Sequence, residues 1–322
     1  MSNSDLISKE YGVVSIVIPV FNNAESLPTL FKKLHNLGVR LQELKLRTEL
    51  IFVDDGSIDN SATILHDFQQ ESPHVKVIKL VKNYGAVNAS RTGLKYVSGQ
   101  AFSILAADLQ DPPEIVFEMC KEWMNGSKFV VCERVSRADP IISRIFSRLH
   151  YFIFRKFVFS SYPKGGFDIA LMDKSMLNTI ISSVKSGSAP LLAFSLGYPP
   201  KILKYDRPAR IHGQSSWTFS KKFNYFLDLI FGYSNRPLRL ISGLGVVVSF
   251  SSFIFAAIVV FNAAFNNISV PGFAALAVLT SFLIGLILLM LGIIGEYIWR
   301  IYEQVNNRPS TMIEYVIESE IY

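Results

Sequence analysis

The sequence predicts an α/β protein in which a doubly wound sheet is followed by a two-helix transmembrane hairpin. Three observations support this fold class. Residues 13–19 form a nearly continuous β-branched run, which is typical of a strand buried on both faces of a parallel sheet. Strand-like and helix-like segments then alternate along the chain. Finally, residues 240–295 contain no Asp, Glu, Lys or Arg.

The elements of the sheet domain are expected in the following order. After residues 13–19, strands are predicted at 49–53, 75–81, 101–106 and 129–131. The helices between them are predicted at 26–35, 61–70, 86–97 and 112–125. Such sheets bind ligands outside the carboxyl ends of their strands, so the residues that directly follow a strand are the first candidates for a site.

The uncharged stretch divides at residues 262–271 into two apolar runs, 239–261 and 272–299. About 20 apolar residues rising ~1.5 Å each cross a hydrocarbon core of ~30 Å, so each run is long enough to span a bilayer. The alternative is a pair of buried core helices, but a hairpin this long would then need a polar stripe toward water, and it has none.

Small residues in these runs would permit close helix contacts and a homo-oligomer, or they simply face lipid. They are Gly243, Gly245, Gly285, Gly292 and Gly295.

The chain carries a formal net charge of +6, and acidic residues outnumber basic ones after residue 239, so the positive charge is concentrated before it. A basic domain suits anionic partners, such as nucleotide phosphates, a lipid phosphate or an anionic membrane surface. Nucleic acid is not expected as a partner, because the basic residues lie next to the membrane signals rather than along one recognition helix.

Basic residues stand at the outer ends of the hairpin, whereas the loop between its helices has no charge. They are Lys221, Lys222, Arg236, Arg239, Arg300 and Arg308. The positive-inside rule therefore predicts that both termini and the sheet domain lie in the cytosol. Because residues 1–11 are polar, we expect no signal peptide before the first strand. Cys120 and Cys132 have neither disulfide nor metal-ligand spacing, as expected in a reducing compartment.

Two further segments mix basic and aromatic residues at helical spacing, residues 141–160 and 219–233. Such amphipathic helices suit the headgroup layer of a membrane, although a helix packed on the protein core would show a similar pattern. The predicted organisation is a cytosolic domain at 1–217 that includes the first of these helices, an interfacial helix at 218–235, transmembrane helices at 236–301 and a cytosolic tail at 302–322.

Acidic turns follow two of the predicted strands. Asp54 and Asp55 come after the second strand and precede a glycine, so their carboxylates stand where a ligand can reach them. An Asp-Gly turn that merely ends a strand has the same appearance. Asp108 and Gln110 come after the fourth strand, in a turn that leads into a helix. Hard oxygen ligands in such a turn suit Mg²⁺ or Mn²⁺ bridging a diphosphate.

Several motifs in order make the chain resemble family-2 glycosyltransferases of GT-A fold. The motifs are Ser15-Ile-Val-Ile-Pro-Val-Phe-Asn22, Val53-Asp-Asp-Gly-Ser57, Asn83-Tyr-Gly-Ala86, Asp108-Leu-Gln-Asp-Pro-Pro-Glu114, Leu171-Met-Asp173, Arg207-Pro-Ala-Arg210 and Gly213-Gln-Ser215. Together with the two C-terminal spans they resemble the polyisoprenyl-phosphate branch, which includes bactoprenol glucosyltransferases and dolichyl-phosphate mannose synthases. The resemblance covers nearly the whole chain. It implies a Rossmann-like GT-A catalytic domain at 1–217.

The resemblance also implies roles for individual residues. The nucleotide-sugar would be bound by Pro19, Asp54, Asp55, Asp108 and Arg210. The metal, Mg²⁺ or Mn²⁺, would be held by Asp108 and Gln110, and the catalytic residues would be Asp108 and Asp168, the latter near the acceptor. Phosphates would be contacted by Arg134, Arg137 and Arg210, in agreement with the fit between guanidinium and phosphate oxygens. A solvated surface arginine is an equally good interpretation of Arg137.

The implied reaction is an inverting, metal-dependent transfer of glucose from UDP-glucose to undecaprenyl phosphate, at the cytoplasmic face of a bacterial plasma membrane. Two alternatives stay open. A processive polysaccharide synthase would need more spans and a Gln-x-x-Arg-Trp motif, where this chain has Gln214-Ser-Ser-Trp217. A catalytically inactive scaffold that binds nucleotide-sugar or lipid would account for Ala106, which stands where relatives often carry the first carboxylate of Asp-x-Asp.

Overall fold

The computed structural model describes residues 11–72, 74–134, 151–152, 154–156, 158–183, 188–205, 233, 236–265, 272–306 and 309–318. The chain forms two compact units. The first consists of Met1–Lys222 together with Pro309–Tyr322, and the second of Phe223–Arg308. Arg137 and Arg210, the interfacial helix predicted at 218–235 and most of the helix predicted at 141–160 lie outside the described residues.

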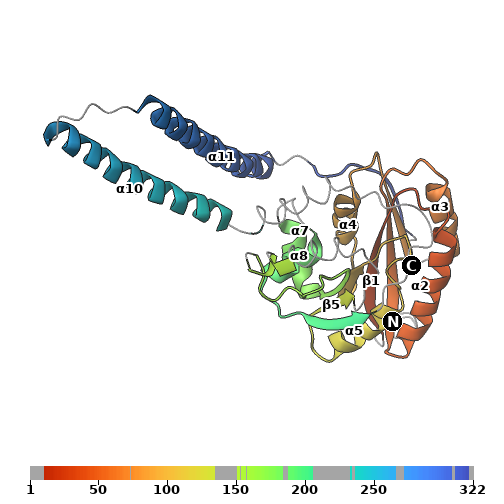
Figure 1. Ribbon diagram of the computed structural model, residues 1–322. Helices are drawn as coiled ribbons and strands as arrows, with labels where there is room; N and C mark the ends of the chain where they lie inside the picture. Colours follow the sequence, from red (N-terminus) through yellow and green to blue (C-terminus); the bar gives the residue numbers. More distant parts are fainter. Residues whose placement is uncertain are drawn as a thin grey trace. The chain divides into compact units, whose positions relative to one another are not determined.

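The first unit is built on one mixed sheet (Figure 1). Its strands are β1 (Gly12–Val20), β2 (Leu46–Asp54), β3 (Val75–Leu80), β4 (Ala101–Ile104), β5 (Phe129–Arg134), β6 (Ile169–Asp173), β7 (Lys201–Tyr205) and β8 (Ile313–Ile317). Their order across the sheet is β7-β5-β6-β4-β1-β2-β3-β8. The central strands β4, β1, β2 and β3 are parallel, as predicted. The sheet as a whole is mixed, because β6 and β8 run antiparallel to their neighbours.

Helices cover both faces of this sheet, which confirms the prediction of a doubly wound sheet. One face carries α2 (Leu27–Gln42), α3 (Ser61–Glu71) and α5 (Ile115–Met124). The other carries α4 (Ala86–Leu94), α7 (Leu177–Ser182) and α8 (Ala189–Ser195). In Figure 1, α2 and α4 lie on opposite sides of β1.

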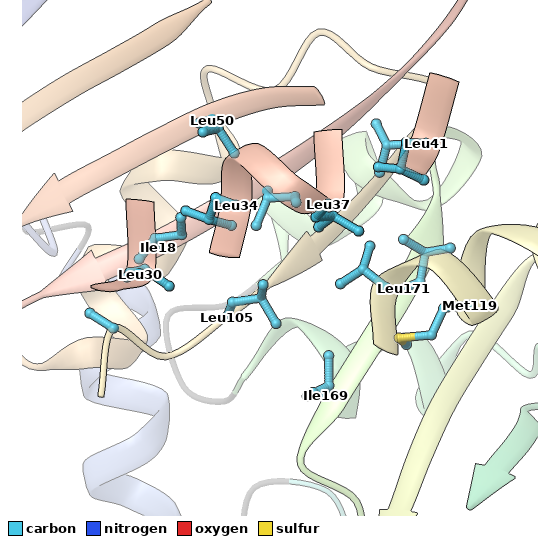
Figure 2. Packing of buried hydrophobic residues seen from close by; sticks show 14 of the residues in the cluster. Ile18, Leu30, Leu34, Leu37, Leu41, Leu50, Leu105, Met119, Ile169 and Leu171 are labelled. Atoms are coloured by element: carbon cyan, nitrogen blue, oxygen red, sulfur yellow. The ribbon is translucent and has the colours of Figure 1, made fainter. Parts of the chain in front are cut away.

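The strand β1 has no polar face because each of its faces packs against helices. Ile16 and Ile18 point into the core beneath α2, and Val17 points into the core beneath α4. On α2, leucines at helical spacing form the apolar stripe that meets this surface. Figure 2 shows four of them, Leu30, Leu34, Leu37 and Leu41, packed with residues of the sheet and α5. This packing fixes the carboxyl end of β1, where the site begins.

The last strand, β8, was not predicted. Residues 302–322 were expected to be a tail, but Ile313–Ile317 pairs with β3 and forms an edge of the sheet. Ile313 and Val316 pack on the core beneath α4, and Ile317 packs on the core beneath α2. The C-terminal segment therefore belongs to the sheet domain.

The second unit consists of two long helices, α10 (Arg236–Phe265) and α11 (Phe273–Val305). Each contains an apolar window long enough to cross a bilayer, Leu238–Phe255 and Phe282–Tyr302, and almost none of these residues is buried. They are candidate membrane spans, at the positions predicted for the hairpin. The loop predicted to start at residue 262 starts later, because α10 continues to Phe265.

The helix predicted at 141–160 is described only near its C-terminal end, and there it has two different faces. Phe154 is completely buried, and its ring lies 4.7 Å from that of Tyr162 between centroids. Phe152, by contrast, is 61% exposed. Phe154 therefore packs on the protein core, whereas Phe152 retains the exposed aromatic surface that an interfacial helix requires.

Candidate active site

The site is built where the parallel strands end. Pro19 and Val53 are register partners on β1 and β2, followed by Val20 and Asp54. Just beyond this pair, the backbone N–H of Asp55 donates to the carbonyl oxygen of Val20 at 2.8 Å. The carboxylates of Asp54 and Asp55 are thereby brought to the carboxyl edge of the sheet, as the sequence predicts.

The two aspartates have different partners. Asp54 is completely buried; its Oδ1 accepts a hydrogen bond from the backbone N–H of Ser57 at 2.9 Å. Among the described residues, no donor reaches Asp54 Oδ2, although this atom is also buried. Buried carboxylate oxygens are normally satisfied. This oxygen is therefore an acceptor suited to an N–H or O–H group of a ligand.

Asp55, in contrast, uses both carboxylate oxygens to hold a loop. Its Oδ1 accepts from the backbone N–H of Tyr84 at 2.7 Å, and its Oδ2 accepts from that of Gly85 at 2.8 Å. Burial raises the pKa of Asp55 above its ordinary value; the two N–H donors oppose this rise, and the neighbouring charge of Asp54 adds to it. Asp55 therefore acts as a clamp on residues 81–85, which connect β3 to α4.

Gly56 allows this loop to approach closely. Its φ is +69°, and a Cβ placed on it would lie 2.5 Å from the carbonyl carbon of Lys82. Any larger residue would meet backbone rather than a flexible side chain, and it would also be strained at this φ. The glycine is required because the turn after β2 packs directly on the loop after β3.

The loop after β1 is fastened to the turn after β2 in a similar way. The backbone N–H of Asn22 donates to Ser57 Oγ at 3.0 Å, and the backbone N–H of Ile58 donates to Asn22 Oδ1 at 3.0 Å. Asn22 has a φ of +53°, a conformation that asparagine tolerates better than most residues. This reciprocal pair of hydrogen bonds makes the two loops a single rigid edge.

Asp108 and Gln110 lie in the turn after β4, as predicted. Both side chains are partly exposed, and Asp108 Oδ1 accepts from the backbone N–H of Gln110 at 3.2 Å. The residue between them, Leu109, has a φ of +60°. Ser26 Oγ donates to the carbonyl oxygen of Ala107 at 2.8 Å, which ties the turn to the start of α2.

Asp108 and Gln110 could supply some of the ligands of a magnesium or manganese ion. Both offer hard oxygen donors, and Mg²⁺ is commonly held by one or two carboxylates together with substrate phosphates and water. No cluster of three His, Cys, Asp or Glu side chains forms a metal site within the described part of the chain. Any metal bound here would therefore take much of its coordination from a phosphate ligand.

A second group of polar side chains lies at the end of β5, the start of β6 and the end of β7. Asp168 directly precedes β6, and Arg134 is the last residue of β5. The Arg134 guanidinium donates from Nε and Nη2 to the two carboxylate oxygens of Asp168. The hydroxyl of Tyr205, the last residue of β7, donates to Asp168 Oδ2 at 2.9 Å.

Electrostatics support this arrangement. Burial disfavours the charge on Arg134, but the hydrogen bonds and negative charge of Asp168 outweigh it and raise the pKa of Arg134 above its ordinary value. The Tyr205 hydroxyl also lies 3.4 Å from Asp111 Oδ1, and both of these residues are buried. Sequence reasoning missed Tyr205 and assigned Asp111 no role in the site. Nothing in the local sequence signals Tyr205, because its partners come from other strands.

The structure places the predicted site residues that it describes in three groups. Pro19, Asp54 and Asp55 share one edge of the sheet, and Asp108 and Gln110 share the turn after β4. Arg134 is paired with Asp168. The phosphate contacts predicted for Arg137 and Arg210 concern residues outside the described ranges and stay predictions.

Comparison with known proteins identifies the family. The sequence profile described as "Glycosyl transferase family 2" matches residues 15–180. The SfII prophage-derived bactoprenol glucosyl transferase of Shigella flexneri is 30% identical, over 94% of this chain and 97% of that one. The undecaprenyl-phosphate 4-deoxy-4-formamido-L-arabinose transferase of Photorhabdus laumondii is 32% identical, over 94% of both chains. An uncharacterized glycosyltransferase of Synechocystis sp. is 33% identical, over 93% of this chain and 94% of that one.

The doubly wound sheet with acidic turns at its carboxyl edge agrees with the fold class that the motifs indicate. The chain belongs to glycosyl transferase family 2. The resemblance stated from the sequence is therefore confirmed.

Proposed function

We propose that the protein transfers a sugar, glucose from UDP-glucose, to undecaprenyl phosphate at the cytoplasmic face of the membrane, with inversion at the anomeric carbon. The observation that carries the proposal is the extent of the match. Relatives named as bactoprenol and undecaprenyl-phosphate transferases align with 94% of the chain, a share too large to leave out the apolar helices α10 and α11. The alignment with these relatives therefore includes both the sheet domain, which would bind the nucleotide-sugar, and the apolar helices, which would lie near the lipid acceptor.

The donor fits the edge formed by β1 and β2. Asp54 Oδ2 is a buried acceptor that no donor of the described residues reaches, and the imide N–H of uracil or a ribose hydroxyl is a donor of the required kind. Asp55 holds the loop beside this edge through the N–H groups of Tyr84 and Gly85. A rigid loop reduces the ordering that a bound nucleotide would otherwise require.

The leaving nucleoside diphosphate is assigned to the turn after β4. Asp108 and Gln110 would hold Mg²⁺ or Mn²⁺ there, and the bound ion would supply positive charge beside the diphosphate. Asp108 is oriented for this by the N–H of Gln110 and by the anchoring of its turn to Ser26. The turn is thus held in place before any ligand binds.

Asp168 is assigned to the acceptor side as a positioning residue rather than a general base. A phosphate monoester has a second pKa near ~6, so it is already mostly dianionic at pH 7 and needs little help to act as a nucleophile. The Asp168 carboxylate accepts hydrogen bonds from Arg134 and Tyr205. A carboxylate held in this way is well placed to orient the acceptor or to stabilise positive charge that develops on the sugar.

The proposal is tested with the purified full-length chain in detergent or lipid vesicles. Radiolabelled UDP-glucose and undecaprenyl phosphate should give a labelled product that extracts into organic solvent and migrates as a lipid-linked sugar on thin-layer plates. Other UDP- and GDP-sugars and a dolichyl phosphate acceptor serve as competitors. Absence of any labelled lipid from every donor, while a bactoprenol glucosyl transferase is active in the same assay, would overturn the proposal.

The proposed orientation has a separate test. A cysteine introduced at Asn266, in the uncharged loop, should react with a membrane-impermeant thiol reagent outside intact cells. Burial raises the pKa of Cys120 and Cys132 to about 12, so these thiols should not compete. Labelling that requires permeabilised cells would contradict the orientation.

A further inference from the structure

The strand β8 supports the donor side of the site from the edge of the sheet. Its backbone pairs with β3 from Val77 to Leu80. One further hydrogen bond lies beyond the end of β3, where the backbone N–H of Val81 donates to the carbonyl oxygen of Met312 at 3.0 Å. Val81 is the first residue of the loop that Asp55 clamps. The C-terminal segment therefore holds the loop where it leaves the sheet.

The same segment also contacts the helix at the other end of the loop. Thr311 Oγ1 lies 2.7 Å from Thr92 Oγ1, a hydrogen bond between the C-terminal segment and α4. Thr92 is buried, and its Oγ1 also reaches the carbonyl oxygen of Asn88 at 3.0 Å. Residues 81–85 are thus held directly at the β3 end by Met312, whereas Thr311 fastens the helix that follows them, α4, near its C-terminal end.

Side chains reinforce the pairing of β8 with β3. Lys79 forms an ion pair with Glu314 at 3.6 Å and lies over the ring of Tyr315. Lys76 forms an ion pair with Glu318 at 3.5 Å. Exposed ion pairs of this kind contribute little stability each, but they favour one register of the strand over others.

Residues 81–85 lie directly against the turn that contains Asp55 and Gly56. Tyr84 and Gly85 donate their N–H groups to Asp55, and the backbone of Lys82 packs on Gly56. A shift of this loop would move the Asp55 carboxylate and the turn beside it. A change in β8 should therefore be felt in the donor pocket rather than on the acceptor side.

We infer that residues 311–317, which follow the apolar helix α11, are a positioning element of the donor site. They hold residues 81–85 in the conformation that binds a nucleoside diphosphate. The inference rests on the proposed function, because that function implies that a nucleoside diphosphate binds at this site. It adds that the nucleotide site is complete only when the segment beyond the second apolar helix is paired with β3.

The test uses the full-length chain with Thr311→Val, which removes the hydroxyl but keeps the shape. We expect UDP binding to weaken about 3- to 10-fold, the range that a single neutral hydrogen bond supplies. The KM for the lipid acceptor should not change. Thr311→Ser, which keeps the hydroxyl, should bind UDP like the wild type. Ser310→Ala is the matched control, because its hydroxyl has no hydrogen-bond partner among the described residues.

Hydrogen exchange provides a readout that does not depend on activity. The N–H groups of Tyr84 and Gly85 should exchange faster in Thr311→Val than in Ser310→Ala, while those of β1 should be unchanged. If Thr311→Val lowers only the thermal stability, or leaves both UDP binding and loop exchange unchanged, β8 is merely structural and the inference is overturned. If the wild type binds UDP but transfers no sugar to lipid, the proposed function fails while the inference stands on the binding result.

Discussion

Replacing Asp168 with Asn should lower kcat, but by less than replacing Asp108 with Asn. Asp168 accepts hydrogen bonds from Arg134 Nε and Nη2 and from the Tyr205 hydroxyl. Its side chain is only 13% exposed. With its oxygens occupied by these donors, and with an acceptor phosphate that is already dianionic near pH 7, its expected contribution is orientation rather than proton transfer.

The geometry sets the size of the effect. An asparagine retains one acceptor oxygen, so at least one N–H of Arg134 loses its acceptor, and the negative partner charge disappears. A hydrogen bond to a charged group contributes ~1.5–3 kcal/mol. If that amount is expressed fully in the transition state, kcat falls about 10- to 150-fold. Loss of a group that stabilises charge in the transition state typically costs ~10²–10³-fold or more, which is the effect expected for Asp108→Asn.

The assay measures kcat at saturating donor and acceptor from about pH 5.5 to 8.5, a range that includes the second pKa of the phosphate near ~6. Asp173→Asn is the matched control. This carboxylate lies at the opposite end of β6 and accepts from Trp123 Nε1 and the N–H of Ser175, so its loss should leave kcat nearly unchanged. The reasoning is refuted if Asp168→Asn loses more kcat than Asp108→Asn and recovers as the pH rises through the phosphate pKa.

Three further predictions follow from the site and the core. Chelation of divalent cations should abolish transfer and Mg²⁺ or Mn²⁺ should restore it; an Asp108→Ala enzyme that is fully active in chelator would contradict the metal assignment. The glycosidic phosphate formed from an α-linked donor should be β-linked by NMR, and an α-linked product would exclude inversion. Burial opposes ionisation of Glu49, but hydrogen bonds from Ser15 and Ser98 and the charge of Lys76 outweigh it and hold its pKa below the ordinary value of 4.5. Because the folded-state pKa is the lower one, this stability is present above about pH 4.5 and is lost as the pH falls through the folded-state value. Glu49→Gln should therefore flatten the acid side of the unfolding free energy against pH, and an unchanged slope would show that other groups cause it.

The parallel half of the sheet could be predicted because its signals are local. The apolar run of β1 is explained by helices on both of its faces, with Ile16 and Val17 in different cores. The predicted strands correspond to β1 to β5, and the predicted helices to α2 to α5, with shifts at their ends. The acidic turns could also be predicted from local sequence, because a polar residue directly after a buried strand commonly forms a turn or contacts a ligand.

The remainder depends on contacts between distant parts of the chain. The strands β6, β7 and β8 have five residues each, and none shows a clear alternation of buried and exposed positions. Their pairing cannot be inferred from residues nearby, because β8 meets a strand that lies more than 200 positions earlier. The Arg134–Asp168–Tyr205 group forms because β5 pairs with both β6 and β7. The family resemblance could therefore suggest Asp168 and Arg134 as site residues, but it could not show that they bind each other.

The neighbouring carboxylates Asp54 and Asp55 show why position after a strand does not by itself assign a ligand contact. In the sequence they are equivalent, and both were predicted to line the nucleotide pocket. In the structure, both oxygens of Asp55 accept backbone N–H groups of the loop between β3 and α4, whereas Asp54 keeps a buried oxygen that no described donor reaches. A carboxylate with a donor on each oxygen is a weaker acceptor for a nucleotide than a carboxylate with one oxygen that lacks a donor. Asp54 is therefore the better candidate for direct donor contact. Asp55 acts through the loop, and this makes the support of that loop by Met312 and Thr311 part of the site.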